Sequence, residues 1–441
     1  MGSTDRVPTN VDLSHHINAK SKSRHPSPLK DIIKYMGHDG MISFAGGLPH
    51  PSLLPLEEAE FSCLTPEASL AGDRKVGADN PDILTLTLGR GASPGDLELS
   101  QFLQYGSGAG NPQLLKLVKE FTQKVHAPPC ELYLVSVGSN PTGITISAQR
   151  RRDIYDICVE FDIIIVEDDP YYFLQFPGYG IPKEPTFHPK PTTEFLENLV
   201  PTFPSMDIQG RVIRLESFSK TLFPGLRMGY FVANPTFTER LLRATEVETQ
   251  DPAGLSQALV LGLLRRWGID GYLTWLQSLQ FQYRERRDWL LDAFHARFVV
   301  LPAAKSPIPQ AQGLVACVRA QEGGELRPVF SFVDPGAGMF VWCKFYFGSV
   351  EEFIEIEKSG ASKDAEQAFA DQLWKAWAAE LVLLTPGSYY HAWQGPDKAT
   401  TKARGADPRT AHFRFSFATP TKEQIDTGVE RLSKVVSRYW R

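Results

Sequence analysis

Hydrophobic residues recur at intervals of three and four in two stretches of the chain, which is the spacing of one face of an α-helix. The first stretch contains Leu114, Leu117, Val118, Phe121 and Val125, and it ends before Pro128 and Pro129. The second covers residues 148–161, with Ile154, Ile157, Cys158 and Phe161 on one side. The pattern therefore predicts two amphipathic helices, each with one buried face.

Short apolar runs before and after the second helix are predicted to be β-strands. They cover residues 132–137, 163–166 and 212–215. The run 163–166 is apolar throughout, which is typical of a strand that is buried on both faces of a parallel sheet. The order strand, helix, strand predicts a βαβ unit, and so an α/β fold with a mostly parallel sheet in a large domain.

The pattern changes after about Pro302, where glycine and proline become more frequent. Predicted strands at 338–345 and 413–417 alternate with predicted helices at 350–359 and 422–440. This alternation indicates a smaller α+β domain at the C-terminus. Residues 62–95 are rich in glycine, aspartate and proline and show little periodicity, so we expect a surface excursion there, without chemistry.

The length of 441 residues exceeds what a single hydrophobic core usually supports. We expect an N-terminal arm and the start of a small domain over residues 1–60. The large domain should cover residues 61–310, and the C-terminal small domain residues 311–441.

Charge and composition narrow the class of protein further. The net charge of -5 and the pI near 6.1 provide no positive field, so nucleic acid and anionic membranes are not expected partners. The longest aliphatic run, residues 258–264, is too short to cross a bilayer. The first residues lack the apolar core of a signal peptide, and we expect a cytoplasmic protein.

Cysteine and histidine offer no obvious metal or disulfide chemistry. The cysteines are odd in number, far apart and without a C-x-x-C pair, which argues against a disulfide framework and against a zinc site. His15 and His16 lie in the polar N-terminal arm, where we expect solvated side chains. No metal site is predicted.

Polar side chains follow the predicted strands at the positions where each strand ends. Asn140 lies in an Asn-Pro-Thr-Gly turn, Asp168 follows the strand 163–166, and Lys220 follows the strand 212–215. In parallel sheets ligands bind beyond the carboxyl ends of the strands, so these three side chains are predicted to form one site. A lysine that forms an imine and a carboxylate that keeps a ring nitrogen protonated are what pyridoxal phosphate (PLP) requires.

The other groups that PLP needs are also present. Tyr171 can donate to the ring oxygen, and Asn140 can bond the same oxygen from the other side. Ser217, Ser219 and Arg227 can hold the phosphate, since the guanidinium fork matches phosphate oxygens. Arg414 is a cation between apolar neighbours in a predicted strand, where a substrate carboxylate would be its partner.

Longer motifs resemble the fold-type I PLP-dependent aminotransferases, most closely the aromatic and kynurenine/α-aminoadipate aminotransferases. The matching stretches are SFAGGLPHP (43–51), QYGSGAGNPQLL (104–115), NPTG (140–143), VEDDPYYFLQF (166–176), SFSKTLFPGLRMGY (217–230), GAGMFVW (336–342) and FRFSFA (413–418). The resemblance covers nearly the whole chain, and the order of the motifs makes it specific. It implies the PLP-dependent transferase fold.

The resemblance also implies a role for each site residue. Lys220 would bind PLP, Asp168 would pair with the pyridine nitrogen, and Asn140 and Tyr171 would hold the ring oxygen. The phosphate would be bound by Ser217, Ser219, Arg227 and, from a neighbouring subunit, Tyr105. Substrate would contact Gly47, Leu48 and Phe340, with its carboxylate on Arg414. These roles imply a homodimer with shared sites, and an aromatic amino acid and a 2-oxo acid as small-molecule partners.

One departure from the family is large. In the family a long segment between the helix that ends near Val125 and the strand before NPTG carries the phosphate-binding turn, a helix N-terminus and an aromatic residue that stacks on the cofactor. Here residues 126–133 run almost directly into 137–140. The large domain is therefore truncated between about 129 and 137. Either the sequence omits an internal piece, such as a skipped exon, or the protein is a damaged or repurposed relative.

The sequence therefore predicts an aminotransferase that moves the amino group between tryptophan, phenylalanine or tyrosine and a 2-oxo acid, such as 2-oxoglutarate or phenylpyruvate. Two alternatives remain open. The first is a non-catalytic or cofactor-defective relative with a binding or regulatory role, suggested by the missing phosphate-binding segment. The second is a PLP-dependent lyase or decarboxylase.

Overall fold

A computed structural model of the chain describes residues 11–25, 56–68, 82–90, 97–103, 107–125, 137–182, 184, 186–320, 324–392 and 399–441. The chain divides into two compact units. Unit 1 comprises Met1–Ser136, Ile146–Phe173 and Phe187–Ser278, and unit 2 comprises Val137–Thr145, Leu174–Thr186 and Leu279–Arg441. The last change from unit 1 to unit 2 along the chain therefore falls between Ser278 and Leu279. The domain boundary that we predicted at 310/311, from the change of pattern after about Pro302, stays a prediction.

Unit 1 contains two small sheets and the helices around them. Its strands are β1 (Glu58–Leu64), β2 (Ile83–Gly89), β3 (Leu97–Glu98), β4 (Ile165–Asp168), β5 (Val212–Ser217) and β6 (Gly229–Val232). Its helices are η1 (Ser14–His16), α1 (Ala19–Lys22), α3 (Ser100–Leu103), α4 (Pro112–Val125), α5 (Ala148–Glu160), α6 (Thr192–Glu197), η3 (Pro204–Met206), η4 (Pro224–Leu226), α7 (Pro235–Glu248) and the first part of α8 (Gly254–Arg297).

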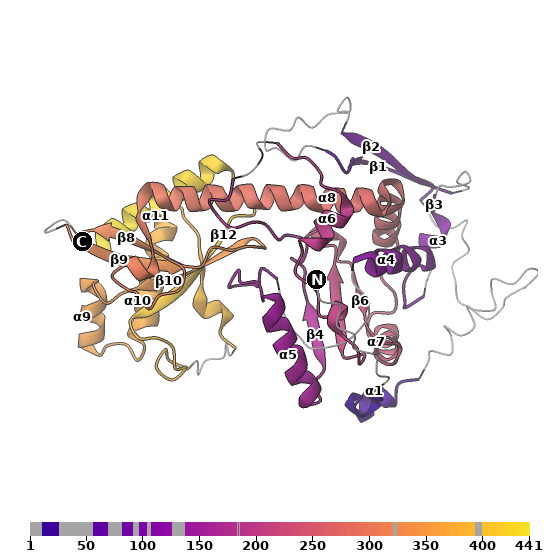
Figure 1. Ribbon diagram of the computed structural model, residues 1–441, viewed down its shortest axis with the longest axis horizontal. Coiled ribbons are helices and arrows are strands. Elements are labelled where there is room, and N and C mark those ends of the chain that lie inside the picture. Colours follow the sequence, from indigo (N-terminus) through magenta and orange to yellow (C-terminus); the bar gives the residue numbers. More distant parts are fainter. Residues whose placement is uncertain are drawn as a thin grey trace, which may run out of the picture. The chain divides into compact units, whose positions relative to one another are not determined.

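The sheet that bears the predicted site residues has the order β4-β5-β6. β4 pairs in parallel with β5, and β5 pairs antiparallel with β6. α5 packs against one face of this sheet, where Tyr155 and Cys158 of the helix meet Ile165 and Val212 of the strands (Figure 1). The helix and the second strand of the predicted βαβ unit are confirmed as α5 and β4. The predicted strand at 132–137 lies outside the described residues except for Val137, so the complete unit stays a prediction.

The predicted helices in unit 1 form as expected, since α4 and α5 begin and end within two residues of the predicted bounds. Ser147 caps α5, because its side chain accepts a hydrogen bond from the Arg150 amide. β4 starts two residues later than predicted, because Ile163 bonds back to the Cys158 carbonyl at the end of α5. The end of α5 thus delays the start of β4 by two residues.

Of the predicted irregular excursion 62–95, the structure describes residues 62–68 and 82–90, and the prediction was wrong there, because these residues hold the end of β1 and all of β2. β1 and β2 are paired antiparallel along their whole length, and β2 pairs in parallel with β3. In β2 the leucines alternate with threonines, and Leu86 and Leu88 are buried. This period of two marks a half-buried strand and was a signal in the sequence.

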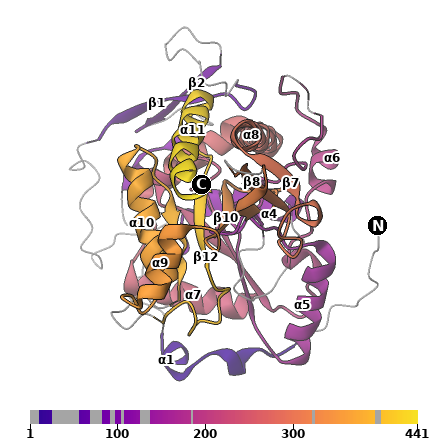
Figure 2. The same cartoon turned by 90° about the vertical axis from the view of Figure 1, so that its left-hand side faces the viewer.

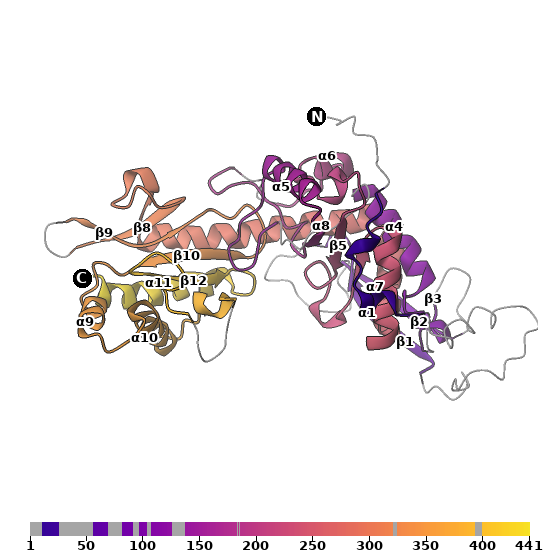
Figure 3. The same cartoon turned by 90° about the horizontal axis from the view of Figure 1, so that it is seen from below.

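α1 packs beside α7 at the N-terminal end of the described chain (Figure 3). Arg240 of α7 donates hydrogen bonds to the carbonyls of Ser21 and Arg24, at 2.9 and 3.2 Å. Arg24 also forms an ion pair with Glu248, at 2.7 Å. The N-terminal segment is therefore held on the surface of unit 1.

Unit 2 is built on a six-stranded sheet of order β11-β12-β10-β9-β8-β7. Its strands are β7 (Val299–Pro302), β8 (Leu314–Arg319), β9 (Leu326–Phe332), β10 (Phe340–Tyr346), β11 (Thr385–Pro386) and β12 (Thr410–Ser416). Its helices are the second part of α8, η5 (Ala303–Lys305), α9 (Glu351–Ser359), α10 (Ala365–Ala379), η6 (Gly387–Tyr390) and α11 (Lys422–Tyr439).

One face of this sheet carries the aromatic core of unit 2. Phe345 of β10 and Phe413 of β12 pack against Trp377 of α10, with ring centroids 5.2 and 5.0 Å away. On the same face Phe415 lies 5.4 Å from Phe294 of α8. Figure 2 shows α9, α10 and α11 together with β10 and β12. The predicted C-terminal α+β elements are therefore confirmed as elements, with ends shifted by up to three residues.

No helix among the described residues is long and apolar enough to cross a membrane.

Candidate active site

Two strands of unit 1 end side by side and carry predicted site residues at their ends. Asp168 is the last residue of β4 and Ser217 is the last residue of β5. Because Asp168 pairs with Leu215, and alternate residues of a strand share a face, Asp168 and Ser217 project from the same face of the sheet. Both are half-buried, which leaves them accessible to a ligand.

The opposite face of the same strands is filled by a buried charge network. Arg214 of β5 bonds to Glu167 of β4 at 2.6 Å and to Glu216 at 2.5 Å. Arg151 of α5 completes the network with a bond of 3.0 Å to the other oxygen of Glu167. The side chains of Arg151, Arg214 and Glu167 are fully buried, so the ion pairs fix β4, β5 and α5 to one another. Asp168 is thereby directed to the accessible face.

Lys220 follows β5 in a turn that is held at both ends. The Ser219 amide donates to Ser217 Oγ at 3.1 Å, which closes the first part of the turn. Thr221 is buried and fixed to α8, since Tyr272 donates to its hydroxyl at 2.9 Å and Trp275 to its carbonyl at 2.6 Å. Lys220 itself is half-buried, and no hydrogen bond or ion pair to its amine is found among the described residues. The amine is therefore available at the accessible end of the strands.

Arg227 lies in the connection between β5 and β6. It adopts the left-handed backbone conformation with φ of 49° and donates one bond, to the Pro224 carbonyl of its own turn, at 3.1 Å. The side chain is exposed, so the rest of the guanidinium can bind an anion. Gly229 pairs with Ser217 at the same edge, where a Cβ would overlap the Glu216 carbonyl oxygen. Only glycine permits this close pairing.

Tyr171 lies in the turn that follows β4 and is buried. Its neighbour Tyr172 donates to the Val200 carbonyl at 2.9 Å, which fixes this turn in unit 1. The position of Tyr171 three residues after Asp168 agrees with the prediction that both serve one site. Its proposed bond to a cofactor oxygen stays a prediction.

A second group of predicted site residues lies in unit 2. Arg414 of β12 stacks over the ring of Phe340 of β10, 4.1 Å from the centroid, and near Tyr390 of η6 at 5.2 Å. Its guanidinium donates hydrogen bonds to Asn140 Oδ1 and to Thr385 Oγ1. Within the part of the chain that the structure describes, Arg414 has no carboxylate partner, and its buried Nε lacks a hydrogen bond. The site is therefore suited to an added carboxylate.

Asn140 reaches Arg414 because its loop packs closely on unit 2. Gly138 and Gly338 both have positive φ, 53° and 77°, and their backbones touch so closely that a Cβ on either would overlap the other. Burial and the nearby Lys344 lower the pKa of His412, on the same face of β12, to about 4. The imidazole is neutral at pH 7 and adds no second cation beside Arg414.

The predicted site residues thus fall into three sets. Asp168, Tyr171, Ser217, Ser219, Lys220 and Arg227 lie in unit 1, whereas Asn140, Phe340 and Arg414 lie together in unit 2. Tyr105, Gly47 and Leu48 lie outside the described residues. Sequence reasoning missed Tyr390 and Thr385, which are brought to Arg414 by the pairing of β11 with β12. No local pattern in the sequence indicates that pairing.

The family model that matches this chain and its relatives by sequence all describe aminotransferases. Residues 112–432 match the family "Aminotransferase class I and II". The chain is 28% identical to an aromatic amino acid aminotransferase of Schizosaccharomyces pombe, covering 98% of both chains. It is 30% identical to an L-tyrosine:2-oxoglutarate aminotransferase of Tapinella panuoides, covering 98% of this chain and 97% of that one.

Solved structures agree with the sequence relatives. The fold matches the crystal structure of the aminotransferase Aro8 from Candida albicans with a TM-score of 0.78 and 28% identity, over 98% of this chain and 99% of that one. The alignment with the S. pombe relative extends over 519 positions, more than the 441 residues of this chain. That relative therefore has residues for which this chain has no counterpart.

Proposed function

Because this chain belongs to the class I and II aminotransferase family, we propose that it is a PLP-dependent aminotransferase that transfers the amino group between an aromatic L-amino acid and a 2-oxo acid. The observation that carries the proposal is the common edge of β4 and β5. There Asp168 and Ser217 end adjacent strands on one face, and Lys220 follows in a turn fixed to α8. The predicted fold class agrees with the family and with the structural relatives.

The residue types at this edge fit PLP. The cofactor, when bound, supplies an electron-withdrawing ring that acidifies the α-proton of an amino acid. Lys220 Nζ would hold the cofactor and move the proton to and from the substrate Cα. The Asp168 carboxylate would keep the ring nitrogen protonated, since an opposite charge nearby favours the charged form. Ser217, Ser219 and the exposed guanidinium of Arg227 would hold the phosphate.

Substrate recognition is assigned to the cluster around Arg414. The substrate α-carboxylate would take the position that no carboxylate fills among the described residues, with Asn140 orienting the guanidinium. Phe340 and Tyr390 place aromatic rings beside it, which favours an aromatic substrate. Tyrosine, phenylalanine and tryptophan as donors agree with the names of the relatives, and 2-oxoglutarate or an aromatic oxo acid such as phenylpyruvate is the proposed acceptor.

Assembly and location are also part of the proposal. We expect a cytoplasmic homodimer in which Tyr105 of one subunit reaches the phosphate of the other, and in which Gly47 and Leu48 approach the substrate. The family resemblance of the motifs around these residues supports the homodimer and the substrate contacts.

Product analysis tests the proposed reaction. The purified chain, supplied with PLP, tyrosine and 2-oxoglutarate, should form the aromatic oxo acid and glutamate in equal amounts. Lys220→Ala should form neither product, while Lys119→Ala, a change of an exposed lysine on α4, should leave the rate unchanged. An amine or ammonia released without glutamate would instead identify a lyase or decarboxylase.

A second candidate function is a binding or regulatory protein that does not retain PLP. It is favoured by the short connection between Val125 and Asn140, and by the unmatched positions in the alignment with the S. pombe relative. A helix N-terminus commonly binds phosphate, and the family places one in the missing segment. Dialysis against PLP-free buffer separates the two functions. The enzyme should keep stoichiometric cofactor, as the full-length S. pombe relative is expected to, and the alternative should lose it.

A further inference from the structure

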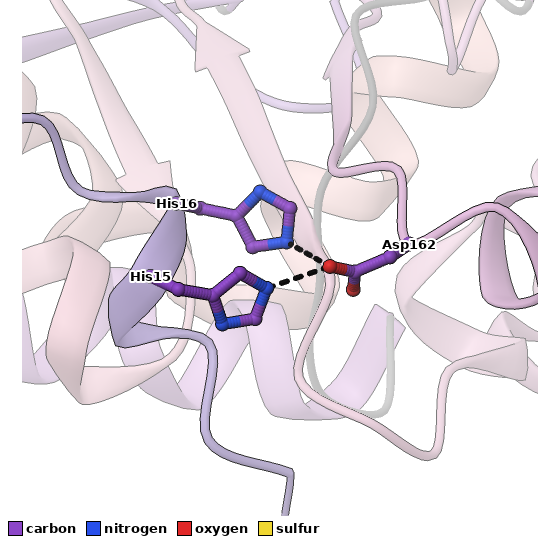
Figure 4. A group of neighbouring side chains, drawn as sticks. All are labelled: His15, His16 and Asp162. Carbon is purple, nitrogen blue, oxygen red and sulfur yellow. Dashed lines mark hydrogen bonds and ion pairs between the residues drawn. The ribbon is translucent and has the colours of Figure 1, made fainter.

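Two adjacent histidines and an aspartate that is distant from them in the sequence meet on the surface of unit 1 (Figure 4). His15 and His16 come from η1 in the N-terminal segment, and Asp162 lies between the end of α5 and the start of β4. The Nε2 atoms of the two histidines lie 2.6 and 3.1 Å from Asp162 Oδ2. All three atoms lie within 4.8 Å of one another. His15 is exposed, as expected of a solvated side chain, whereas His16 is half-buried, so the expectation of solvated histidines was wrong for His16 only.

The carboxylate is fixed in position before any ligand binds. Asp162 has a positive φ of 52°, and its Oδ1 accepts a hydrogen bond of 2.8 Å from Nη1 of the buried Arg211. The same Nη1 also donates to the Ile163 carbonyl, at 3.3 Å. Arg211 therefore occupies one carboxylate oxygen and leaves Oδ2 directed at the two imidazoles, which is how outer groups orient a metal ligand.

The histidines are also held by their own segment. Leu13 is buried, and the Asp12 carboxylate accepts the Ser14 amide at 2.9 Å, which fixes the start of η1. The two rings lie against each other, with centroids 4.2 Å apart. Three ligand groups are thus presented from two segments that are each anchored to unit 1.

The two imidazoles share one carboxylate oxygen. His15 Nε2 makes a hydrogen bond with Asp162 Oδ2, and the buried Nε2 of His16 lies 3.1 Å from the same oxygen, within ion-pair distance but without hydrogen-bond geometry. A cation placed between the two nitrogens and Oδ2 would bind all three atoms at once.

We propose that His15 Nε2, His16 Nε2 and Asp162 Oδ2 form a binding site for a divalent transition-metal ion of the Zn²⁺ type. Imidazole and carboxylate are ligands of this class of ion, and three protein ligands leave a fourth position for water. In a tetrahedral zinc site with bonds of about 2.0–2.1 Å the ligand atoms are roughly 3.3 Å apart, so each Nε2 needs to move away from Asp162 Oδ2 by less than about 1 Å.

The position of the site indicates what the ion does. Asp162 precedes β4, whereas Asp168 ends it, so the metal lies at the end of the strand opposite to the proposed cofactor edge. The ion links the N-terminal segment to the turn between α5 and β4. It therefore stabilises unit 1 and takes no part in transamination.

Zinc titration of the untagged full chain after chelator treatment tests this site. Calorimetry should show zinc binding that weakens about tenfold or more in each of His15→Ala, His16→Ala and Asp162→Asn. Zinc should raise Tm of the wild type, because a ligand that binds only the folded state stabilises it, and not of these variants. His25→Ala removes an exposed histidine of the same segment and should bind zinc like the wild type.

Zinc binding that is absent in the wild type, or equally tight in His15→Ala and His16→Ala, would overturn the proposal. Circular dichroism confirms that each variant is folded, so a loss of binding cannot be mistaken for a loss of structure. The readout does not depend on PLP or on transaminase activity, and it therefore stands apart from the proposed function.

Discussion

Arg414 is the residue on which substrate recognition should depend most. Replacing it with glutamine removes the charge but keeps hydrogen-bond donors toward Asn140 and Thr385. A charge-assisted hydrogen bond contributes about 1.5–3 kcal/mol, so KM for the amino acid should rise roughly 10- to 100-fold. Arg409→Gln is the matched control, because Arg409 forms a surface ion pair with Glu357 and should leave KM unchanged. Equal KM values in both variants would remove Arg414 from the substrate site.

Asp207 is expected to make the free energy of unfolding depend on pH. Burial raises the pKa of this carboxyl to about 8, against the opposing effect of the Gln209 and Gly210 amides. Its unfolded pKa is near 3.8. Between these values the folded state keeps a proton that the unfolded state has lost, so the free energy of unfolding should fall as pH rises through this window and level off above about pH 8.

The variant Asp207→Asn isolates this effect. Asn keeps an oxygen that can accept from Tyr155 and the two amides, but it cannot titrate. Urea unfolding below, within and above the pH window should show the fall in the wild type relative to the variant. A difference that does not change with pH would mean that the carboxyl is ionised in the folded protein.

At the scale of single residues, the sequence predicted the contacts that follow from neighbouring positions in the chain and missed those that depend on tertiary packing. Asp168, Ser217 and Lys220 follow their strands directly, so their shared edge could be expected from the chain order. The meeting of His16 with Asp162 depends on where the N-terminal segment packs, which no sequence pattern describes. The same reason explains why Tyr390 was missed beside Arg414.

Strands β4 and β5 depend on the charge network beneath them. Arg214→Met would leave Glu167 and Glu216 buried with only Arg151 as a cation. Breaking a buried ion pair on one side typically costs about 3–5 kcal/mol, and unfolding of the variant should show a loss of this size. Arg152→Met changes an exposed arginine of α5 and should cost less than about 0.5 kcal/mol. If Arg214→Met lowers the free energy of unfolding no more than Arg152→Met does, the network does not hold the strands.

The spacing of hydrophobic residues along the chain was the most reliable guide to the fold. The helices with an apolar stripe were located to within two residues, because burial of one face determines both their existence and their length. β1 and β2 were missed because glycine and proline around them suggested irregular structure, although the Leu-Thr alternation of β2 was present. Alternation within a short run is better evidence than the composition of its surroundings.

At the scale of the whole molecule the predicted site is divided between the two units, and the connection after α4 is short. The residues proposed for the ring nitrogen and the covalent attachment belong to unit 1, and the residue proposed for the substrate carboxylate belongs to unit 2. The family resemblance predicted that both sets of residues serve one site. It also predicted that a segment after α4 is missing. The unmatched positions in the alignment with the S. pombe relative agree with that segment's absence.

The central claim is that Lys220 holds PLP at the edge formed by β4 and β5, and absorbance spectroscopy tests it most directly. The wild type, incubated with PLP and freed of excess by gel filtration, should retain an absorbance band of protein-bound cofactor. Lys220→Ala should lose that band, and Lys119→Ala should retain it. A wild-type protein without the band, or a Lys220→Ala variant whose spectrum equals that of the wild type, would contradict the account.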